Sequence, residues 1–125
     1  MKAVILAAGL GSRMRPLTFT KPKFLLPVAG RPALDHVLSL MKNSGIKEIC
    51  MIVGYGREQI IDRYGDGSRF GVKLTYVHQK ELLGTANALG LAEEFVSGEN
   101  FLAINGDTLV DQESLNLLIK KHDEV

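Results

Sequence analysis

The sequence is poor in cysteine and has no long apolar run. Cys50 is its only cysteine, so one chain can form neither a disulfide framework nor a cluster of thiolate metal ligands. This indicates a reducing, cytoplasmic location. No segment approaches the roughly 20 apolar residues that span a bilayer, which argues against a membrane protein. The N-terminal apolar run stops at Gly9, too early for a secretory signal peptide.

Acidic residues are missing from the beginning of the chain. Residues 1–34 contain six basic residues, and the first carboxylate is Asp35. The net charge of the whole chain is nevertheless only +1, without the overall positive charge that is typical of nucleic-acid-binding domains. Basic residues gathered in one stretch favour a small anion bound at one place.

The length and the hydrophobic pattern predict one α/β domain. The 125 residues, 46% of them hydrophobic, are enough for one domain with a real core and too few for two. Apolar, β-branched runs alternate with amphipathic runs, which predicts helices over a mainly parallel sheet. The predicted strands cover residues 2–7, 48–53, 72–77 and 101–105. The predicted helices cover residues 32–44, 57–64 and 85–95, and a last helix follows Asp111.

Several helix ends and buried faces can also be predicted. Pro32 fits the first turn of a helix, and Gly45 ends that helix. Thr85 and Asp111 are the expected N-caps of the last two helices. The periodicity predicts that these helical residues are buried: Leu34, Val37, Leu38 and Met41; then Ile60, Ile61 and Tyr64; and finally Leu115, Leu118 and Ile119.

The loop after the first strand contains two glycines and two arginines. Gly9 and Gly11 allow backbone N–H groups to point inward together, and Arg13 and Arg15 add full positive charge, so the loop suits a phosphate. The plainer alternative is a tight turn with two solvated arginines. The loop is neither a dinucleotide fingerprint, since Met14 stands at the third glycine position, nor a P-loop, since no Lys-Ser or Lys-Thr pair follows.

The longer pattern resembles the sugar-1-phosphate nucleotidyltransferases, also called nucleoside-diphosphate-sugar pyrophosphorylases. The resemblance rests on Gly9-x-Gly11-Ser12-Arg13-Met14-x-Pro16-Leu17-Thr18, Lys21-Pro22-Lys23 and Leu26-Pro27-Val28-Ala29-Gly30-Arg31-Pro32, and it continues through Gln79, Leu83-Gly84-Thr85 and Gly106-Asp107. It covers nearly the whole chain. It implies a three-layer α/β/α Rossmann-like fold and an enzyme that joins a nucleoside triphosphate (NTP) to a sugar 1-phosphate and releases pyrophosphate.

The resemblance also implies roles for individual residues. Arg13 and Lys23 are the expected catalytic residues, Arg13 at the β- and γ-phosphates and Lys23 at the α-phosphate. Asp107 is the expected ligand of Mg²⁺; the alternative for Asp107 is a turn or helix cap. The expected nucleotide-binding residues are Leu6, Ala7, Ala8, Gly9, Gly11, Ser12, Gln79, Gly84, Thr85 and Gly106.

Gln79 bears on the choice of base. Its carboxamide offers a donor and an acceptor side by side, which matches the N3–H and O4 edge of uracil or thymine and therefore favours UTP or dTTP. Gln79 could instead be an exposed loop residue. A mannose-1-phosphate guanylyltransferase is the alternative within the family, and a regulatory module that only binds a nucleotide sugar is the alternative outside enzymes.

The resemblance implies that residues 1–125 form the nucleotide-binding N-terminal portion of a catalytic domain. The family's domain continues for about as many residues again, so we expect a truncated fold that lacks the sugar site and the second metal-binding aspartate. We therefore expect this chain alone to bind nucleotide weakly and to turn over poorly. The full-length enzyme is expected to be a homo-oligomer without nucleic-acid or membrane partners.

Overall fold

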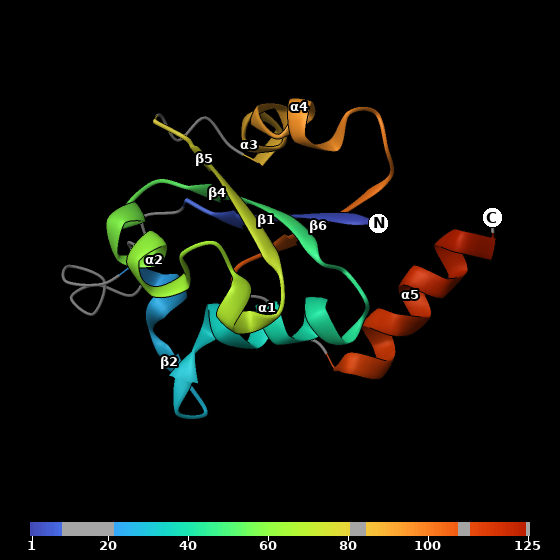
Figure 1. Ribbon diagram of the computed structural model, residues 1–125, viewed down its shortest axis with the longest axis horizontal. Helices are drawn as coiled ribbons and strands as arrows, with labels where there is room; N and C mark the ends of the chain where they lie inside the picture. The colour runs from blue at the N-terminus through green and yellow to red at the C-terminus, as the bar shows by residue number, and fades with distance from the viewer. Residues whose placement is uncertain (9–21, 81–84, 108–110, 125) are drawn as a thin grey trace.

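A four-stranded parallel sheet forms the centre of the protein (Figure 1). The computed structural model describes residues 1–8, 22–80, 85–107 and 111–124. The strand order is β5-β4-β1-β6, so β1 pairs with β4 on one side and with β6 on the other. The strands are β1 (Lys2–Ala7), β4 (Glu48–Val53), β5 (Lys73–His78) and β6 (Phe101–Asn105). Three strands have the predicted bounds, and β5 is shifted by one residue.

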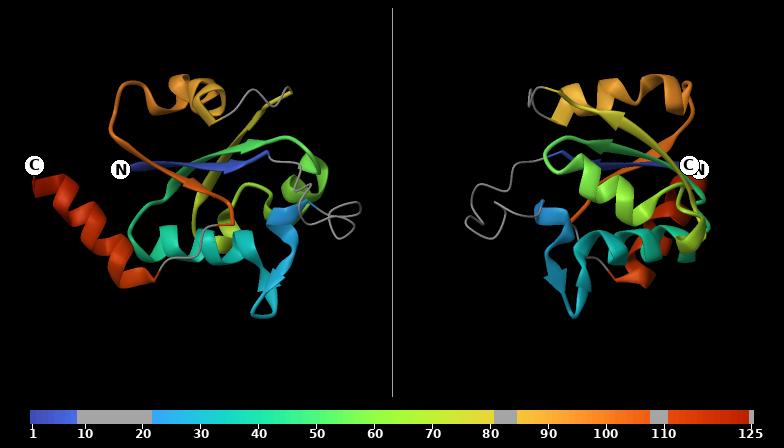
Figure 2. Two further views of the ribbon diagram at one scale, coloured as in Figure 1. Left: turned by 180° about the vertical axis from the view of Figure 1, so that it is seen from behind. Right: turned by 60° about the vertical axis from the view of Figure 1, so that its left-hand side comes forward.

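Helices cover both faces of the sheet, which confirms the three-layer α/β/α fold (Figure 2). One face packs against α1 (Ala33–Asn43) and α2 (Arg57–Tyr64), with one turn of α5 (Gln112–Glu124). The other face packs against α3 (Thr85–Leu91) and α4 (Glu93–Val96). Parallel sheets need cover on both faces because their strands are apolar on both sides. In β4, accordingly, every residue after Glu48 is buried.

The first helix matches the predicted apolar face. Leu34, Val37, Leu38 and Met41 are all fully buried, as a stripe of apolar residues at helical spacing requires. The helix begins at Ala33 and ends at Asn43, one residue inside the predicted bounds at each end. Gly45 follows with φ +83°, a left-handed conformation that glycine adopts without a steric penalty after a helix.

Two predicted core residues are exposed. Ile61 in α2 is 37% exposed and Leu118 in α5 is 57% exposed. The eight residues of α2 offer only Ile60 and Tyr64 to the core. In α5, Leu115 is buried and Ile119 packs partly against the core. Figure 1 shows that α5 extends beyond the sheet, so only part of the predicted apolar face finds a partner.

The ends of the later helices differ in part from the prediction. The structure confirms Asp111 as an N-cap, since its Oδ1 accepts a 2.8 Å hydrogen bond from the backbone N–H of Ser114. This hydrogen bond lowers the pKa of Asp111. The predicted helix 85–95 is instead two helices, α3 and α4, which are separated at Ala92. Thr85 is the first residue of α3 rather than its cap, and residue 84 lies outside the described residues.

Residues 22–32, predicted as a loop up to Gly30, contain regular structure. A short 3₁₀ helix, η3 (Lys23–Leu25), is followed by a hairpin of β2 (Pro27–Val28) and β3 (Arg31–Pro32). Ala29 and Gly30 have φ of 50° and 81°. Positive φ at both central residues is typical of the two-residue turns that join antiparallel strands. Lys23 is therefore held in a folded segment.

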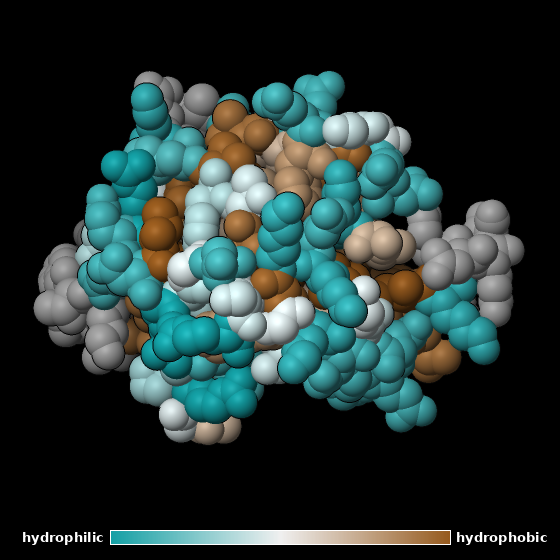
Figure 3. All heavy atoms as spheres, viewed as in Figure 1, coloured by the Kyte–Doolittle hydropathy of each residue, from teal (hydrophilic) through white to brown (hydrophobic). Residues whose placement is uncertain are grey.

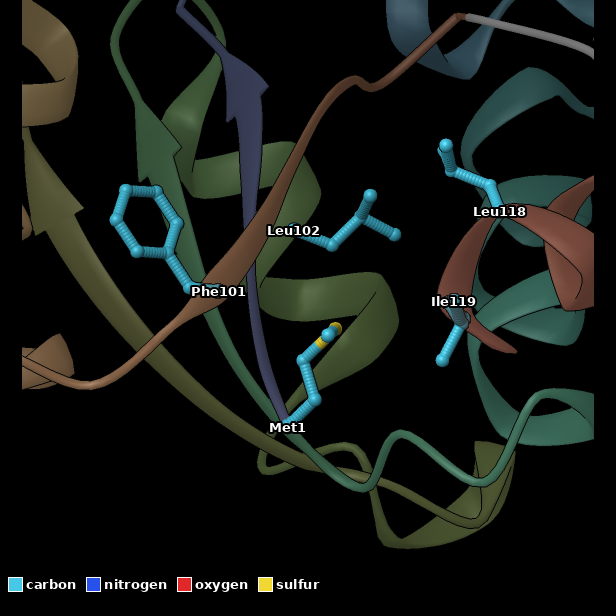
Figure 4. Close-up of a pocket in the computed structure, with 5 residues that line it drawn as sticks. All are labelled: Met1, Phe101, Leu102, Leu118 and Ile119. Carbon is cyan, nitrogen blue, oxygen red and sulfur yellow. The ribbon is translucent and has the colours of Figure 1, made fainter. Parts of the chain in front are cut away.

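An apolar pocket lies at the end of the sheet where β1 and β6 begin. It has a volume of about 210 Å³ and is lined by Met1, Phe101, Leu102, Leu118 and Ile119. Figure 4 shows Leu102 extending toward α5. Polar side chains cover most of the face seen in Figure 3, with apolar patches between them. In the part of the chain that the structure describes, no helix is both long and apolar enough to cross a bilayer.

Candidate functional site

The candidate site lies at the carboxyl ends of the strands. The chain builds the sheet outward from β1 through β4 to β5, and then returns to place β6 on the other side of β1. In such sheets, ligands bind where the strand order reverses, beyond the carboxyl ends. Here the reversal lies between β1 and β6. The backbone N–H of Gly106 donates a 2.9 Å hydrogen bond to the carbonyl oxygen of Leu6, so pairing continues to this edge.

Lys23 and Asp107 meet at this edge. The ammonium Nζ of Lys23 lies 3.5 Å from Oδ2 of Asp107, and the two side chains are 29% and 41% exposed. Lys23 begins η3, in which the N–H of Leu25 donates to the carbonyl oxygen of Pro22. Its neighbour Phe24 is buried, and Lys23 Nζ lies 5.1 Å from the centre of that ring. A positive and a negative group are thus fixed together while both remain accessible to a ligand.

Gly106 permits this approach. A Cβ at position 106 would lie 2.9 Å from Cδ1 of Phe24 and 3.3 Å from Cδ1 of Leu34. The first distance is shorter than a carbon–carbon contact allows, and the aromatic ring is itself packed in the core. A side chain at this position would therefore push η3 away from the end of β6, and with it Lys23 from Asp107.

Gln79 occupies a buried position beyond β5. Its backbone N–H donates a 2.8 Å hydrogen bond to the carbonyl oxygen of Val53, and its side-chain Nε2 donates a 3.1 Å bond to Oδ1 of Asn87 in α3. The residue is only 5% exposed, so the alternative of an exposed loop residue is wrong. Beside it, the half-buried His78 accepts a 3.0 Å hydrogen bond at Nδ1 from Arg57 of α2.

The predicted residues of the first strand contribute mainly backbone. Ala7 and Ala8 are buried, and Leu6 packs against the core on the α3 side. At this edge the described part of the strand therefore offers the backbone of Ala7 and Ala8 to a ligand. Five predicted site residues lie outside the described residues: Gly9, Gly11, Ser12, Arg13 and Gly84. The side chain of Thr85 is likewise outside the description.

The described site residues form two groups along one edge. Lys23, Gly106 and Asp107 lie together at the β1–β6 end, whereas Gln79 follows β5 at the other end of the sheet. Neighbouring strands are about 4.8 Å apart, so three strand spacings separate the groups by roughly 14 Å. An extended nucleotide can span such a distance, with its base at one end and its phosphates at the other.

The β6 end offers one accessible carboxylate, that of Asp107, to a divalent cation. In the described ranges, no cluster of three or more His, Cys, Asp and Glu side chains could hold a metal by itself. Mg²⁺, however, is commonly held by one or two carboxylates together with the phosphates of a substrate. The accessible carboxylate of Asp107 can supply such a ligand.

Asp35 is a buried charged residue that the sequence patterns did not single out. It is 4% exposed, in the first turn of α1, and both of its oxygens accept hydrogen bonds from Arg63 of α2. Burial by itself raises the pKa of Asp35, but the hydrogen bonds from Arg63 and Tyr64 outweigh burial and hold this pKa below its ordinary value. The only feature of the sequence that could have indicated its burial is its place beside the apolar positions of the predicted helix.

The comparisons with known proteins give one consistent result. A family model described as nucleotidyl transferase matches residues 2–125. The chain is 44% identical over 119 residues to a low-salt glycan biosynthesis nucleotidyltransferase of Haloferax volcanii, covering 94% of this chain and 33% of that protein. It is 46% identical over 112 residues to an N-acetylmuramate α-1-phosphate uridylyltransferase of Neisseria meningitidis, covering 89% of this chain and 48% of that protein.

A solved structure shares the fold of almost the whole chain. It belongs to a protein described as a glucose-1-phosphate thymidylyltransferase of Bacillus anthracis, and it superimposes with a TM-score of 0.93 at 35% identity. The match covers 99% of this chain and 50% of that chain. The chain thus spans between a third and a half of the length of these relatives.

Proposed function

This chain belongs to the nucleotidyl transferase family, and from that premise we propose a function for the intact protein. It transfers a nucleoside monophosphate from UTP or dTTP to a sugar 1-phosphate and releases pyrophosphate. The product is a nucleoside-diphosphate sugar. The observation that carries the proposal is the Lys23–Asp107 pair at the carboxyl edge of the sheet, because this reaction needs both a cation and a metal-binding carboxylate around the phosphates.

The chemistry needs positioning and charge neutralisation more than it needs a protein nucleophile. A phosphate oxygen of the sugar 1-phosphate forms a bond to the α-phosphorus of the NTP. The bond between that phosphorus and the bridging oxygen breaks, and this oxygen leaves with pyrophosphate. Phosphoryl-type transfers of this kind are catalysed mainly by aligning the two groups and by stabilising the crowded negative charge.

The described residues can perform these tasks. Lys23 provides a positive charge for the α-phosphate, and Asp107 is the residue that would hold Mg²⁺. When bound, Mg²⁺ neutralises phosphate charge. Lys23 and Asp107 neutralise each other in the structure, so the substrate phosphates would take over the ammonium group and the metal would take over the carboxylate. Arg13, outside the described residues, is proposed to hold the leaving pyrophosphate.

Gln79 is proposed to recognise the base. Its carboxamide is oriented by the hydrogen bond that Nε2 donates to Asn87, and the residue is 5% exposed. An oriented amide can pair with the N3–H and O4 edge of uracil or thymine, whereas guanine presents two adjacent donors there and suits a carboxylate better. This supports UTP or dTTP as the substrate.

The experiment compares how the wild-type protein and the Lys23→Met variant respond to different nucleotides. Thermal shift and pyrophosphate release are measured with UTP, dTTP and GTP, in magnesium and with a panel of sugar 1-phosphates. We expect UTP or dTTP to raise the melting temperature most and to support turnover. Lys2→Met is the matched control for Lys23→Met, because Lys2 also has a carboxylate partner, Glu99 at 3.6 Å, and lies 5.1 Å from a phenyl ring.

Each alternative predicts a different result in this experiment. A guanylyltransferase would respond to GTP first. A nucleotide-sugar sensor would bind ligand without releasing pyrophosphate from any pair of substrates. Equal losses of activity in Lys23→Met and Lys2→Met would show that Lys23 has no special role at the phosphates.

A further inference from the structure

Asp35 joins α1 to α2 through an ion pair in which the carboxylate is buried and the side chain of Arg63 is 42% exposed. Arg63 donates from Nε to Oδ1 at 3.0 Å and from a terminal nitrogen to Oδ2 at 2.7 Å. The hydroxyl of Tyr64 donates to Oδ1 at 2.6 Å. Arg31 adds a longer contact of 3.9 Å to Oδ2. Two-point pairing of a carboxylate with a guanidinium fixes direction as well as distance.

Simple stabilisation explains this arrangement poorly. Burying the carboxylate of Asp35 costs desolvation free energy, and an ion pair to a partly exposed guanidinium contributes little net stability in return. The rest of the buried α1 face is apolar. What the pair provides beyond stability is a fixed geometry between the first turn of α1 and the last turn of α2.

The first turn of α1 supports both members of the Lys23–Asp107 pair. The backbone N–H of Ala33 donates a 3.1 Å hydrogen bond to the carbonyl oxygen of Leu26, directly after η3. The side chain of Leu34 lies against Gly106, the residue before Asp107. Asp35 is the next residue along the helix. Three consecutive residues thus contact the segment of Lys23, the segment of Asp107 and the neighbouring helix.

The other end of α2 contacts the same segment. Gly56, the N-cap of α2 with φ +72°, lies so close to Pro22 that a Cβ would be 2.7 Å from the proline ring. Pro22 immediately precedes Lys23. Helix α2 therefore contacts the lysine segment at its beginning and Asp35 at its end.

We propose that Asp35 is a positioning residue that holds Lys23 and Asp107 in register at the edge of the sheet, through α1 and α2. The proposal rests on the function proposed above for that pair. Asp35 does not touch substrate. It acts by anchoring the first helical turn on which the two segments rest, so its loss lets the lysine and the carboxylate move apart.

The experiment uses the intact protein with Asp35→Asn, which keeps the size of the side chain and removes its charge. Calorimetry measures the affinity for UTP and dTTP in EDTA, where Lys23 acts without metal, and steady-state kinetics measures kcat and KM in magnesium. We expect nucleotide affinity to fall about tenfold and kcat between about tenfold and about a hundredfold, since small misplacements at a reacting centre have effects of this size.

Two comparisons separate positioning from general destabilisation. Val96→Ala, in the core on the opposite face of the sheet, lowers the melting temperature but should leave affinity and kcat within about twofold of wild type. In a double-mutant cycle, Asp35→Asn should change affinity little once Lys23→Met is present, because residues that act through one another are not additive. If Asp35→Asn does not fold, Tyr64→Phe removes only one hydrogen bond from Asp35 and should show a smaller effect of the same pattern.

The outcomes are distinct. Wild-type affinity and kcat in Asp35→Asn or in Tyr64→Phe, equal losses in Val96→Ala, or additive effects in the cycle would overturn the proposal. If the wild-type protein binds UTP or dTTP but releases no pyrophosphate with any sugar 1-phosphate, the proposed function fails. The affinities in EDTA then still decide whether Asp35 positions Lys23.

Discussion

The ammonium group of Lys23 lies 3.5 Å from a carboxylate oxygen of Asp107, although the two residues come from opposite ends of the sequence. Lys23 is the first residue of the short 3₁₀ helix η3, and Asp107 lies two residues after the end of β6. The contact forms because β6 returns to the side of β1 and because Gly106 leaves room for Phe24 and Leu34. The fold thereby creates a charged pair at the edge where parallel sheets bind ligands.

Replacing Lys23 by Met should separate binding from stability. The partly exposed ion pair contributes less than about 1 kcal/mol to the free energy of unfolding, so urea denaturation should show little change. Affinity for UTP or dTTP should fall about tenfold, because a charge-assisted contact to phosphate is lost. Calorimetry with Lys2→Met as the control measures this. Undiminished nucleotide affinity in Lys23→Met would remove Lys23 from the site.

Replacing Gln79 by Ala should reduce selectivity among bases. The oriented amide is worth about 1 kcal/mol for each of its two hydrogen bonds to the base, so the preference for UTP or dTTP over GTP should fall by roughly thirtyfold. The ratio of the kcat/KM values measures this, and the ratio cancels losses that are common to all nucleotides. A variant with lower activity but an unchanged ratio would show that Gln79 does not recognise the base.

Stability should depend on pH through Asp35. Its pKa in the folded state lies below the ordinary value of 3.8, so the unfolded chain takes up this proton first as the pH falls. The stabilisation is complete above about pH 5 and is lost as the pH falls through the folded pKa. Urea denaturation between pH 7 and pH 3 should show a smaller decrease for Asp35→Asn than for wild type.

Asp35→Asn should also be less stable at neutral pH, by about 2 kcal/mol, because Arg63 and Tyr64 lose a charged partner. Asp66 and Asp111, whose pKa values are also lowered, are retained in the variant, so some acid sensitivity remains. Identical pH profiles for the two proteins would contradict the assignment to Asp35.

Two leucines of α5 offer a matched test of the packing. Leu115 is 4% exposed and Leu118 is 57% exposed. Leu115→Ala should cost about 2–4 kcal/mol of unfolding free energy, since it leaves a cavity under the helix. Leu118→Ala should change stability by less than about 0.5 kcal/mol. Equal losses would mean that α5 packs more closely on the sheet than the structure shows.

The sequence patterns predicted the sheet well because each strand is a continuous apolar run bounded by turn residues. They failed where the burial of a residue depends on a tertiary contact or where an element is very short. Leu118 has the spacing of a buried residue, but α5 extends past the sheet and leaves it exposed. The hairpin at Ala29 and Gly30 was missed because its strands are only two residues long.

The sequence patterns named candidate site residues but not the residue that we propose positions them. The residue types and the family pattern pointed to Lys23, Gln79 and Asp107. Asp35 was not found, because its partner Arg63 is distant in sequence and only folding brings the two helices together. The burial of Gln79 likewise involves a tertiary contact, because its side chain donates a hydrogen bond to Asn87 of α3.

The most direct test of the central claim is pyrophosphate release by the intact protein and by its Asp107→Ala variant, with UTP or dTTP, magnesium and a panel of sugar 1-phosphates. Wild type should release pyrophosphate with at least one pair of substrates. Asp107→Ala should lose this activity at least about a hundredfold while it keeps the wild-type melting temperature within a few degrees. Undiminished turnover in Asp107→Ala, or no turnover by the wild type with any pair, would contradict the proposed site.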